Sequence, residues 1–142
     1  MPAAFFDTNV FLYAALPQLE PRDEAKRQIA IELIAQEDYV ISSQVLAEFY
    51  HNAVRKKGPR LSHALGMGWI ERLSEQPCLP VDPALVETGA AFSERYQISY
   101  WDGAMIAAAQ ALAADRFYTE DLNDGQIYGT VKVINPFKSS NH

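Results

Sequence analysis

Four acidic residues are spaced along this 142-residue chain so that alternating strands and helices would bring them to one end of a sheet. The first of them, Asp7, follows the apolar residues 3–6 and so belongs at the C-terminal end of a first strand, where open α/β sheets bind ligands. Carboxylates that converge in one pocket repel one another, and a hard divalent cation relieves this repulsion. The pattern therefore predicts a metal site formed by Asp7, Glu48, Asp102 and Asp121.

The expected metal is Mg²⁺, for which Mn²⁺ can substitute, because both prefer oxygen ligands and keep several bound waters. The remaining coordination positions would accept phosphate oxygens and an attacking water. Such a site suits phosphodiester hydrolysis, in which the metal activates water and stabilises charge on the attacked phosphate. The protein itself would position the reactants without supplying a nucleophile.

The first two acids also have purely structural explanations. Asp7, Thr8 and Asn9 are all good helix N-caps, so capping of the helix after the first strand would account for them. Glu48 lies at the rim of an apolar helical stripe, beside Asn52 at i+4, and a glutamate at such a rim is often merely solvated. The functional interpretation of Glu48 therefore depends on the other acids.

The last two acids are open to a second interpretation as well. Asp102 stands three residues after Ser99, which is the spacing of a capping box, although capping and metal ligation do not exclude each other. The fourth motif contains three acids, Glu120, Asp121 and Asp124, in a loop whose Asn-Asp-Gly sequence is typical of a turn. Spacing alone leaves open which of these three would face a metal.

The intervening sequence predicts the elements that would position the acids. Short apolar runs bounded by turn residues indicate strands, and apolar residues at helical spacing indicate helices between them, the third capped by Ser42 or Ser43. This alternation implies right-handed crossovers and a mainly parallel sheet covered on both faces. The expected fold is a three-layer α/β/α sandwich over residues 1–137, followed by a polar tail, 138–142, that we expect to be disordered. Strands are expected at residues 3–6, 39–41, 78–81, 116–119 and 131–134, and helices at 10–16, 22–36, 44–57, 62–74, 82–96 and 102–114.

Composition and charge exclude several classes of protein. With 49% hydrophobic residues and no apolar run near the ~18 residues of a membrane span, the chain is expected to be a soluble, cytoplasmic protein. The single cysteine, Cys78, excludes an intramolecular disulfide. A net charge of −6 argues against a general polyanion-binding surface, yet four basic residues gather between positions 55 and 60. They form either a solvated helix end or a set of phosphate contacts.

Four ordered motifs resemble the PIN domain, and most closely its VapC-type toxins. They are FDTN at residues 6–9, Glu48 within a mid-chain helix, SYWD at 99–102 and YTED at 118–121, so the resemblance extends over residues 3–137. It implies a metal-dependent endoribonuclease that acts as the toxin of a type II toxin–antitoxin system. The fourth motif departs from the usual family pattern at residues 122–125. The residues that carry over are the metal-site acids Asp7, Glu48, Asp102 and Asp121 with the supporting Thr8, Asn9 and Thr119, to which we add Asp124 from the same loop.

The resemblance also implies two protein partners, because members of the family commonly pair as homodimers and are held inactive by an antitoxin that covers the active cleft. We expect the antitoxin to contact a groove lined by the helices at residues 22–36 and 44–57. The RNA substrate is expected to contact Arg55, Lys56 and Arg60 through its phosphates rather than its bases. No membrane partner is expected.

Two other classes of function compete with the nuclease. A metal-dependent phosphatase or phosphotransfer domain could use a similar sheet with an acidic strand end. A phosphatase of the dehalogenase type would have a second Asp where this chain has Asn9, and a receiver domain would have a well-placed late Lys. The other rival is a non-catalytic protein-binding module whose acids are only structural. Failure of Mg²⁺ or Mn²⁺ to stabilise the fold would favour that module.

Overall fold

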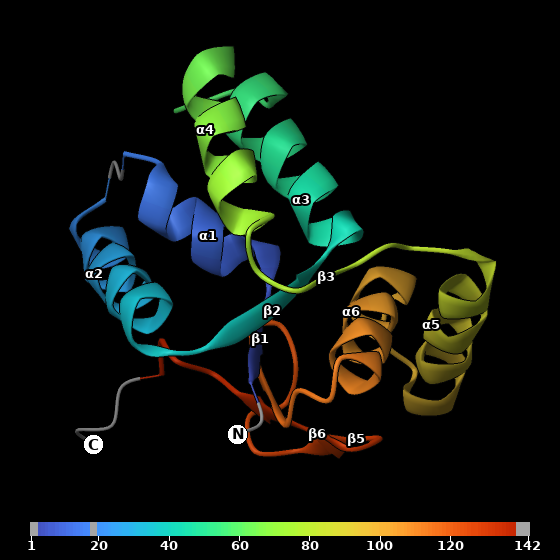
Figure 1. Ribbon diagram of the computed structural model, residues 1–142. Coiled ribbons are helices and arrows are strands. Elements are labelled where there is room, and N and C mark those ends of the chain that lie inside the picture. The colour runs from blue at the N-terminus through green and yellow to red at the C-terminus, as the bar shows by residue number, and fades with distance from the viewer. Residues whose placement is uncertain (1–2, 18–19, 139–142) are drawn as a thin grey trace.

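Six short strands form one sheet within residues 3–17 and 20–138, the part of the chain that the computed structural model describes (Figure 1). From one edge to the other the strands are β3 (Cys78–Leu79), β2 (Tyr39–Ser42), β1 (Ala4–Phe6), β4 (Arg116–Tyr118), β6 (Val131–Ile134) and β5 (Ile127–Tyr128). Every pairing is parallel except that of β5 with β6. The predicted tail lies outside the described residues, apart from Lys138.

Helices cover both faces of this sheet. Helices α1 to α4 pack together on one side, and α5 packs on α6 on the other (Figure 1). This arrangement confirms the predicted α/β/α sandwich with a mainly parallel sheet. None of the helices in the described ranges combines the length and the apolar character that a membrane crossing requires. The helical segments are α1 (Thr8–Ala15), α2 (Pro21–Gln36), α3 (Ser43–Tyr50), η1 (His51–Arg55), α4 (His63–Leu73), α5 (Pro83–Tyr96) and α6 (Tyr100–Ala111).

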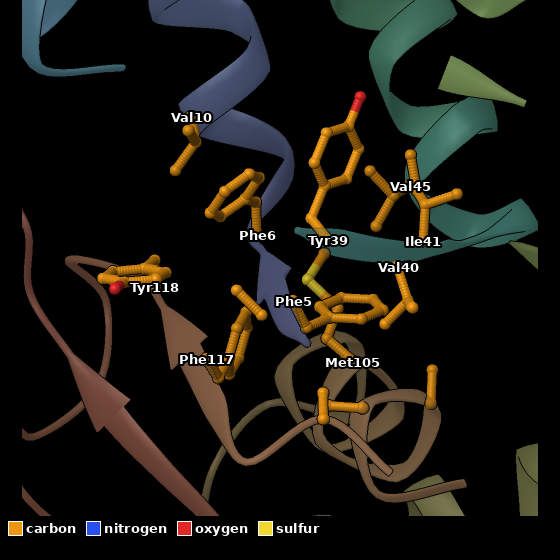
Figure 2. Packing of buried hydrophobic residues seen from close by; sticks show 14 of the residues in the cluster. Phe5, Phe6, Val10, Tyr39, Val40, Ile41, Val45, Met105, Phe117 and Tyr118 are labelled. Atoms are coloured by element: carbon orange, nitrogen blue, oxygen red, sulfur yellow. The ribbon is translucent and has the colours of Figure 1, made fainter. Parts of the chain in front are cut away.

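Strand β1 is apolar and buried along its whole length, as expected of a strand in a parallel sheet with both faces covered. Phe5 on β1 meets Phe117 on β4 edge to face, with ring centroids 5.7 Å apart (Figure 2). On the neighbouring position of β1, Phe6 packs against Tyr39 and Tyr118. These contacts fix the register of β1 and β4, and with it the positions of the residues that follow the two strands.

Three local expectations were wrong. Ser42 stands at the N-cap position of α3, but neither serine caps the helix: the Ser42 hydroxyl is buried without a partner, and that of Ser43 accepts a hydrogen bond from the Val81 amide at 3.0 Å. The predicted helix 44–57 changes at Tyr50 into the π-helical turn η1, where the Lys56 amide bonds the His51 carbonyl five residues back. Strand β5 was missed, since two residues are too few for a periodic signal.

Candidate active site

The pairing of β1 with β4 brings the first and fourth motifs together. Asp7, 5% exposed, accepts a hydrogen bond of 2.8 Å from the Thr119 hydroxyl, which itself accepts one of 3.1 Å from the Asp121 amide. Asp7 stands at the N-cap position of α1, but its side chain makes no capping hydrogen bond. The structural explanation for Asp7 therefore fails, and its carboxyl group faces the other acids instead.

The environment of Asp7 shifts its carboxyl group toward the protonated acid. Burial raises its pKa from the ordinary 3.8 to about 7, and a hydrogen bond with Asp121 and the charges of Asp121 and Asp102 act in the same direction. The hydrogen bond from Thr119 opposes the rise without cancelling it. A buried carboxyl group surrounded by other carboxylates is poorly stable as an anion unless a cation compensates the charge.

The third acid is held at the start of α6. Ser99 caps this helix by accepting a hydrogen bond of 3.1 Å from the Asp102 amide, so the capping spacing read from the sequence is confirmed. Burial raises the pKa of the Asp102 carboxyl, and the charges of Asp121 and Glu48 add to the rise. A side-chain hydrogen bond with Ser99 opposes this rise, so the Asp102 carboxylate interacts both with the capping serine and with the other acids.

Glu48 has both of its carboxylate oxygens fixed by neighbours. The Thr8 hydroxyl donates to Oε1 at 2.7 Å, and the Gln44 amide donates to Oε2 at 3.0 Å. Asn52 bonds the Glu48 backbone carbonyl at 2.8 Å and so does not hold the side chain. The sequence reading missed Gln44, although its i,i+4 spacing from Glu48 is a usable signal.

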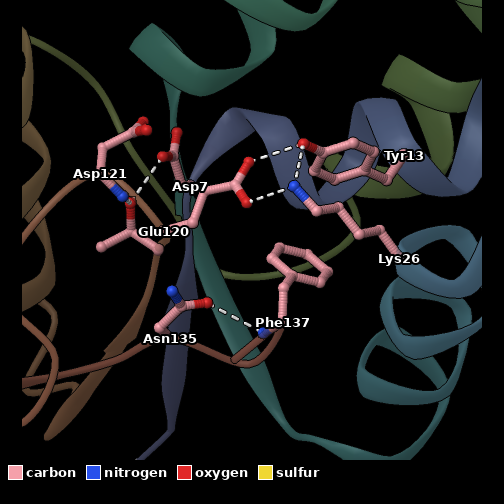
Figure 3. A network of polar contacts seen from close by, with 8 residues as sticks. Asp7, Tyr13, Lys26, Glu120, Asp121, Asn135 and Phe137 are labelled. Carbon is pink, nitrogen blue, oxygen red and sulfur yellow. Dashed lines mark hydrogen bonds and ion pairs between the residues drawn. The ribbon is translucent and has the colours of Figure 1, made fainter. Parts of the chain in front are cut away.

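The three acids of the fourth motif have different partners, and Figure 3 shows those of Glu120. Glu120 is turned away from the cluster, accepting from the Tyr13 hydroxyl at 2.6 Å and pairing with Lys26 at 2.9 Å. Asp124 accepts a hydrogen bond of 2.9 Å from the Asn135 amide and lies 3.5 Å from the Lys138 ammonium. The structure thus brings Asp121 to Asp7 and does not bring Asp124, which the sequence grouped with the site, to the acids.

The remaining predicted residues lie around the acid cluster or apart from it. Asn9 and Lys56 line a cavity of about 510 Å³ between α1, the start of α2 and η1. Arg55, at the end of η1, and Arg60, in the following loop, are exposed to solvent. None of these three basic residues pairs with an acid in an ion pair shown by the described residues.

The donor set suits a hard cation. Across residues 3–17 and 20–138, no three acidic, His or Cys side chains are arranged to hold a metal ion directly as they stand. Mg²⁺, however, is usually bound through one or two carboxylates and several waters. Asp7 and Asp121 form such a pair, with Asp102 and Glu48 near enough to interact electrostatically. The residues present therefore fit a hydrated divalent ion.

By sequence, residues 4–126 match the family profile of the PIN domain. No curated protein matches the chain by sequence.

Solved structures resemble the chain in fold at low identity. A toxin–antitoxin complex from Klebsiella pneumoniae is 18% identical with a TM-score of 0.67, over 94% of this chain and 98% of that one. VapC20 of Mycobacterium tuberculosis, a toxin that cleaves the sarcin–ricin loop, is 21% identical with a TM-score of 0.63, over 84% and 90% of the two chains. FitAB (FitAcB) of Neisseria gonorrhoeae is 22% identical with a TM-score of 0.57, over 94% of this chain and 98% of that one.

Proposed function

This chain belongs to the PIN domain family, and on that basis we propose that it is a metal-dependent endoribonuclease using Mg²⁺, or Mn²⁺ in its place. The observation that carries the proposal is the buried Asp7 carboxyl, which meets Asp121 and Asp102 at the C-terminal end of the central strands. A buried acid of this kind has no structural partner that requires it to be charged. Its position is explained by a cation and a phosphodiester substrate.

The proposed roles of the residues follow from their contacts. Asp7 and Asp121 would hold the metal directly, while Asp102 and Glu48 would bind its waters. When bound, the metal supplies an activated water and stabilises charge on the attacked phosphate. Thr119 orients the Asp7 carboxyl through its 2.8 Å hydrogen bond, and Thr8 orients Glu48 at 2.7 Å. The two threonines thus restrict the acids to one geometry, as preorganised catalysis needs.

We also propose that the protein is the toxin of a toxin–antitoxin pair and works in the cytoplasm as a homodimer. The likeness in fold to the toxin–antitoxin complex and to FitAB supports this assignment. The cavity of about 510 Å³ carries Lys56 and Lys57 on one side and Glu20 and Asp23 on the other. Such a mixed-charge groove, adjoining α1 and α2, is where we place the antitoxin contact.

The direct test is cleavage of total cellular RNA by the purified protein, with Mg²⁺ and with EDTA. Discrete fragments that form only with Mg²⁺ are expected. The matched variants are Glu48→Gln, which removes one acid of the cluster, and Glu87→Gln, which removes an exposed acid of α5. Fragments should disappear in the first variant and persist in the second. Intact RNA with turnover of small phosphomonoesters would replace the proposal with the phosphatase.

Metal binding should stabilise the protein more at high pH than at low pH. Below its pKa of about 7, Asp7 binds a proton that the metal has to displace, so the apparent affinity falls about tenfold per pH unit. With Mg²⁺ at 100 times its dissociation constant at pH 8, the free energy of unfolding should rise by about 2.7 kcal/mol, and by less than about 0.5 kcal/mol at pH 5. Urea denaturation with and without Mg²⁺ measures both. Equal gains at both pH values would remove Asp7 from the metal site.

Binding of RNA should depend on salt through the basic residues that follow α3. If Arg55, Lys56 and Arg60 contact phosphates, replacing each by Gln reduces the slope of log affinity against log salt by about 0.7 for a single-stranded ligand. The loss should be similar for RNAs of different sequence. Filter binding at a series of salt concentrations gives the slope, with Arg95→Gln on α5 as the control. If the variant with all three residues replaced by Gln keeps the wild-type slope of log affinity against log salt, these residues do not contact phosphates.

A further inference from the structure

An aromatic side chain lies exposed beside the acid cluster. Trp101 is 61% exposed, although large hydrophobic side chains are usually buried. Its ring meets that of Tyr100 edge to face, with centroids 5.0 Å apart. Gln44, which also holds Glu48, donates a hydrogen bond of 3.2 Å to the Trp101 carbonyl. The backbone of Trp101 is therefore tied to α3 while much of its ring faces solvent.

Trp101 borders a cavity of about 490 Å³ that shares Glu48 with the acid cluster. Glu48 lines this cavity as well as belonging to the four acids, and Asp102 is the residue that follows Trp101. The other walls include Tyr100, His51 and Asn52, so flat aromatic surface stands next to side chains that can donate or accept hydrogen bonds. An RNA strand with one phosphate at the acids would place a neighbouring nucleotide in this cavity.

Base stacking on an aromatic ring is the chemistry that this surface offers. Every nucleobase has an apolar face that stacks on Trp or Tyr, and only an unpaired base exposes that face. Gln44, His51 and Asn52 stand where the edge of such a base could be hydrogen-bonded. The phosphates of the same strand would lie toward the acids, where a divalent ion offsets the negative charge.

We propose that Trp101 and the adjoining cavity form a stacking subsite for an unpaired nucleobase next to the scissile phosphate. This inference rests on the proposed nuclease function. It is independent of the basic residues 55–60, which would contact phosphates and not bases.

The test compares two ligands: a short single-stranded oligouridylate and the same ribose-phosphate backbone without bases. Binding is measured with the full-length protein in EDTA, so that no cleavage is needed. Trp101→Ala should weaken binding of the oligouridylate by roughly 5- to 100-fold and leave binding of the base-free backbone unchanged. Trp101→Tyr should restore most of the affinity. Ile127→Ala, at an equally exposed position on β5, is the matched control and should bind both ligands normally.

Fluorescence gives a second readout that a structural role for Trp101 would not produce. The chain has two tryptophans, so Trp69→Phe leaves Trp101 as the single reporter. The oligouridylate should quench its emission, and the base-free backbone should not. Equal loss of both ligands in Trp101→Ala, or no loss of either, would overturn the inference. If Trp101 is quenched by bases but no RNA is ever cleaved, the nuclease function fails while the base-binding subsite stands.

Discussion

The Asp7→Asn variant is expected to lose Mg²⁺-dependent RNA cleavage by about 10³-fold or more. A bound metal ion contributes several kcal/mol of transition-state stabilisation, and each 1.4 kcal/mol corresponds to a factor of ten in rate. Asn keeps the size of Asp7 and can still accept the hydrogen bond from Thr119, so the substitution removes the charge without removing the contact. The measurement is the initial rate of cleavage at saturating Mg²⁺.

The same variant should be more stable than the wild type when no metal is present. Folding raises the pKa of Asp7 from 3.8 to about 7, a difference of about three pH units at roughly 1.4 kcal/mol each. Well below pH 4 the group is protonated in both the folded and the unfolded chain, so it has no effect. As the pH rises to 7 the unfolded chain loses its proton first, and the wild type loses stability. Asp7→Asn should therefore unfold with a free energy about 2–4 kcal/mol higher at pH 8 and about equal at pH 4.

Glu87→Gln is the control for both measurements, since it removes one negative charge from an exposed position of α5. It should alter neither the cleavage rate nor the pH dependence of stability. An Asp7→Asn protein that is inactive but destabilised at pH 8 would mean that the acid holds the fold together. In that case loss of activity would say nothing of metal binding.

Gly103→Ala is expected to lower the free energy of unfolding by about 3 kcal/mol. The two helices α5 and α6 approach so closely that a Cβ at position 103 would lie 2.5 Å from the Gly89 carbonyl oxygen and 3.0 Å from the Ser93 amide. Both contacts are with backbone atoms, which cannot rotate away, so the helices have to separate. Because Asp102 precedes Gly103, their separation should also displace an acid of the cluster and reduce cleavage.

Gly68→Ala is the matched control, because Gly68 lies within α4 and a Cβ there would meet nothing within 4 Å. Alanine is the better helix former, so this change should stabilise the protein by about 0.5–1 kcal/mol. Urea denaturation of the two variants gives the comparison. If Gly103→Ala were as stable as the wild type, the close approach of α5 and α6 would have to be relaxed easily, and Asp102 would not depend on it.

The sequence was most informative where local pattern and global fold agree. Apolar runs marked β1 and β4 because both faces of these strands are buried, and the Ser99 cap fixed the start of α6. The strand ends then placed the first and fourth motifs at one edge of the sheet. Which acid of the fourth motif points inward was not readable, since Glu120 is drawn away by Lys26 from a helix 94 residues earlier.

The errors have a common cause in contacts between distant parts of the chain. Ser43 is drawn from the helix start by the Val81 amide, 38 residues later, and the carbonyl of Ala53 in η1 accepts a hydrogen bond from the Leu61 amide of the returning chain. Strand β5 exists only because it pairs with β6 through a two-residue turn that begins at Gly129, whose φ of 61° suits glycine. Local propensity contains none of these interactions. The assignment of the four acids to a metal remains a prediction.

The order of the strands also determines when the acid cluster can exist during synthesis. The hydrogen bond between Thr119 and Asp7 spans 112 residues, and it depends on the pairing of β1 with the late strand β4. Contacts at such separation form late, because the intervening loop has to be closed before they contribute. A ribosome-bound chain that ends before β4 therefore carries Asp7, Glu48 and Asp102 but lacks Asp121 and the Thr119 hydroxyl that bonds Asp7. Such a nascent chain would be inert toward the RNA that surrounds it, and any activity would begin only after β4 has been synthesised and has paired with β1.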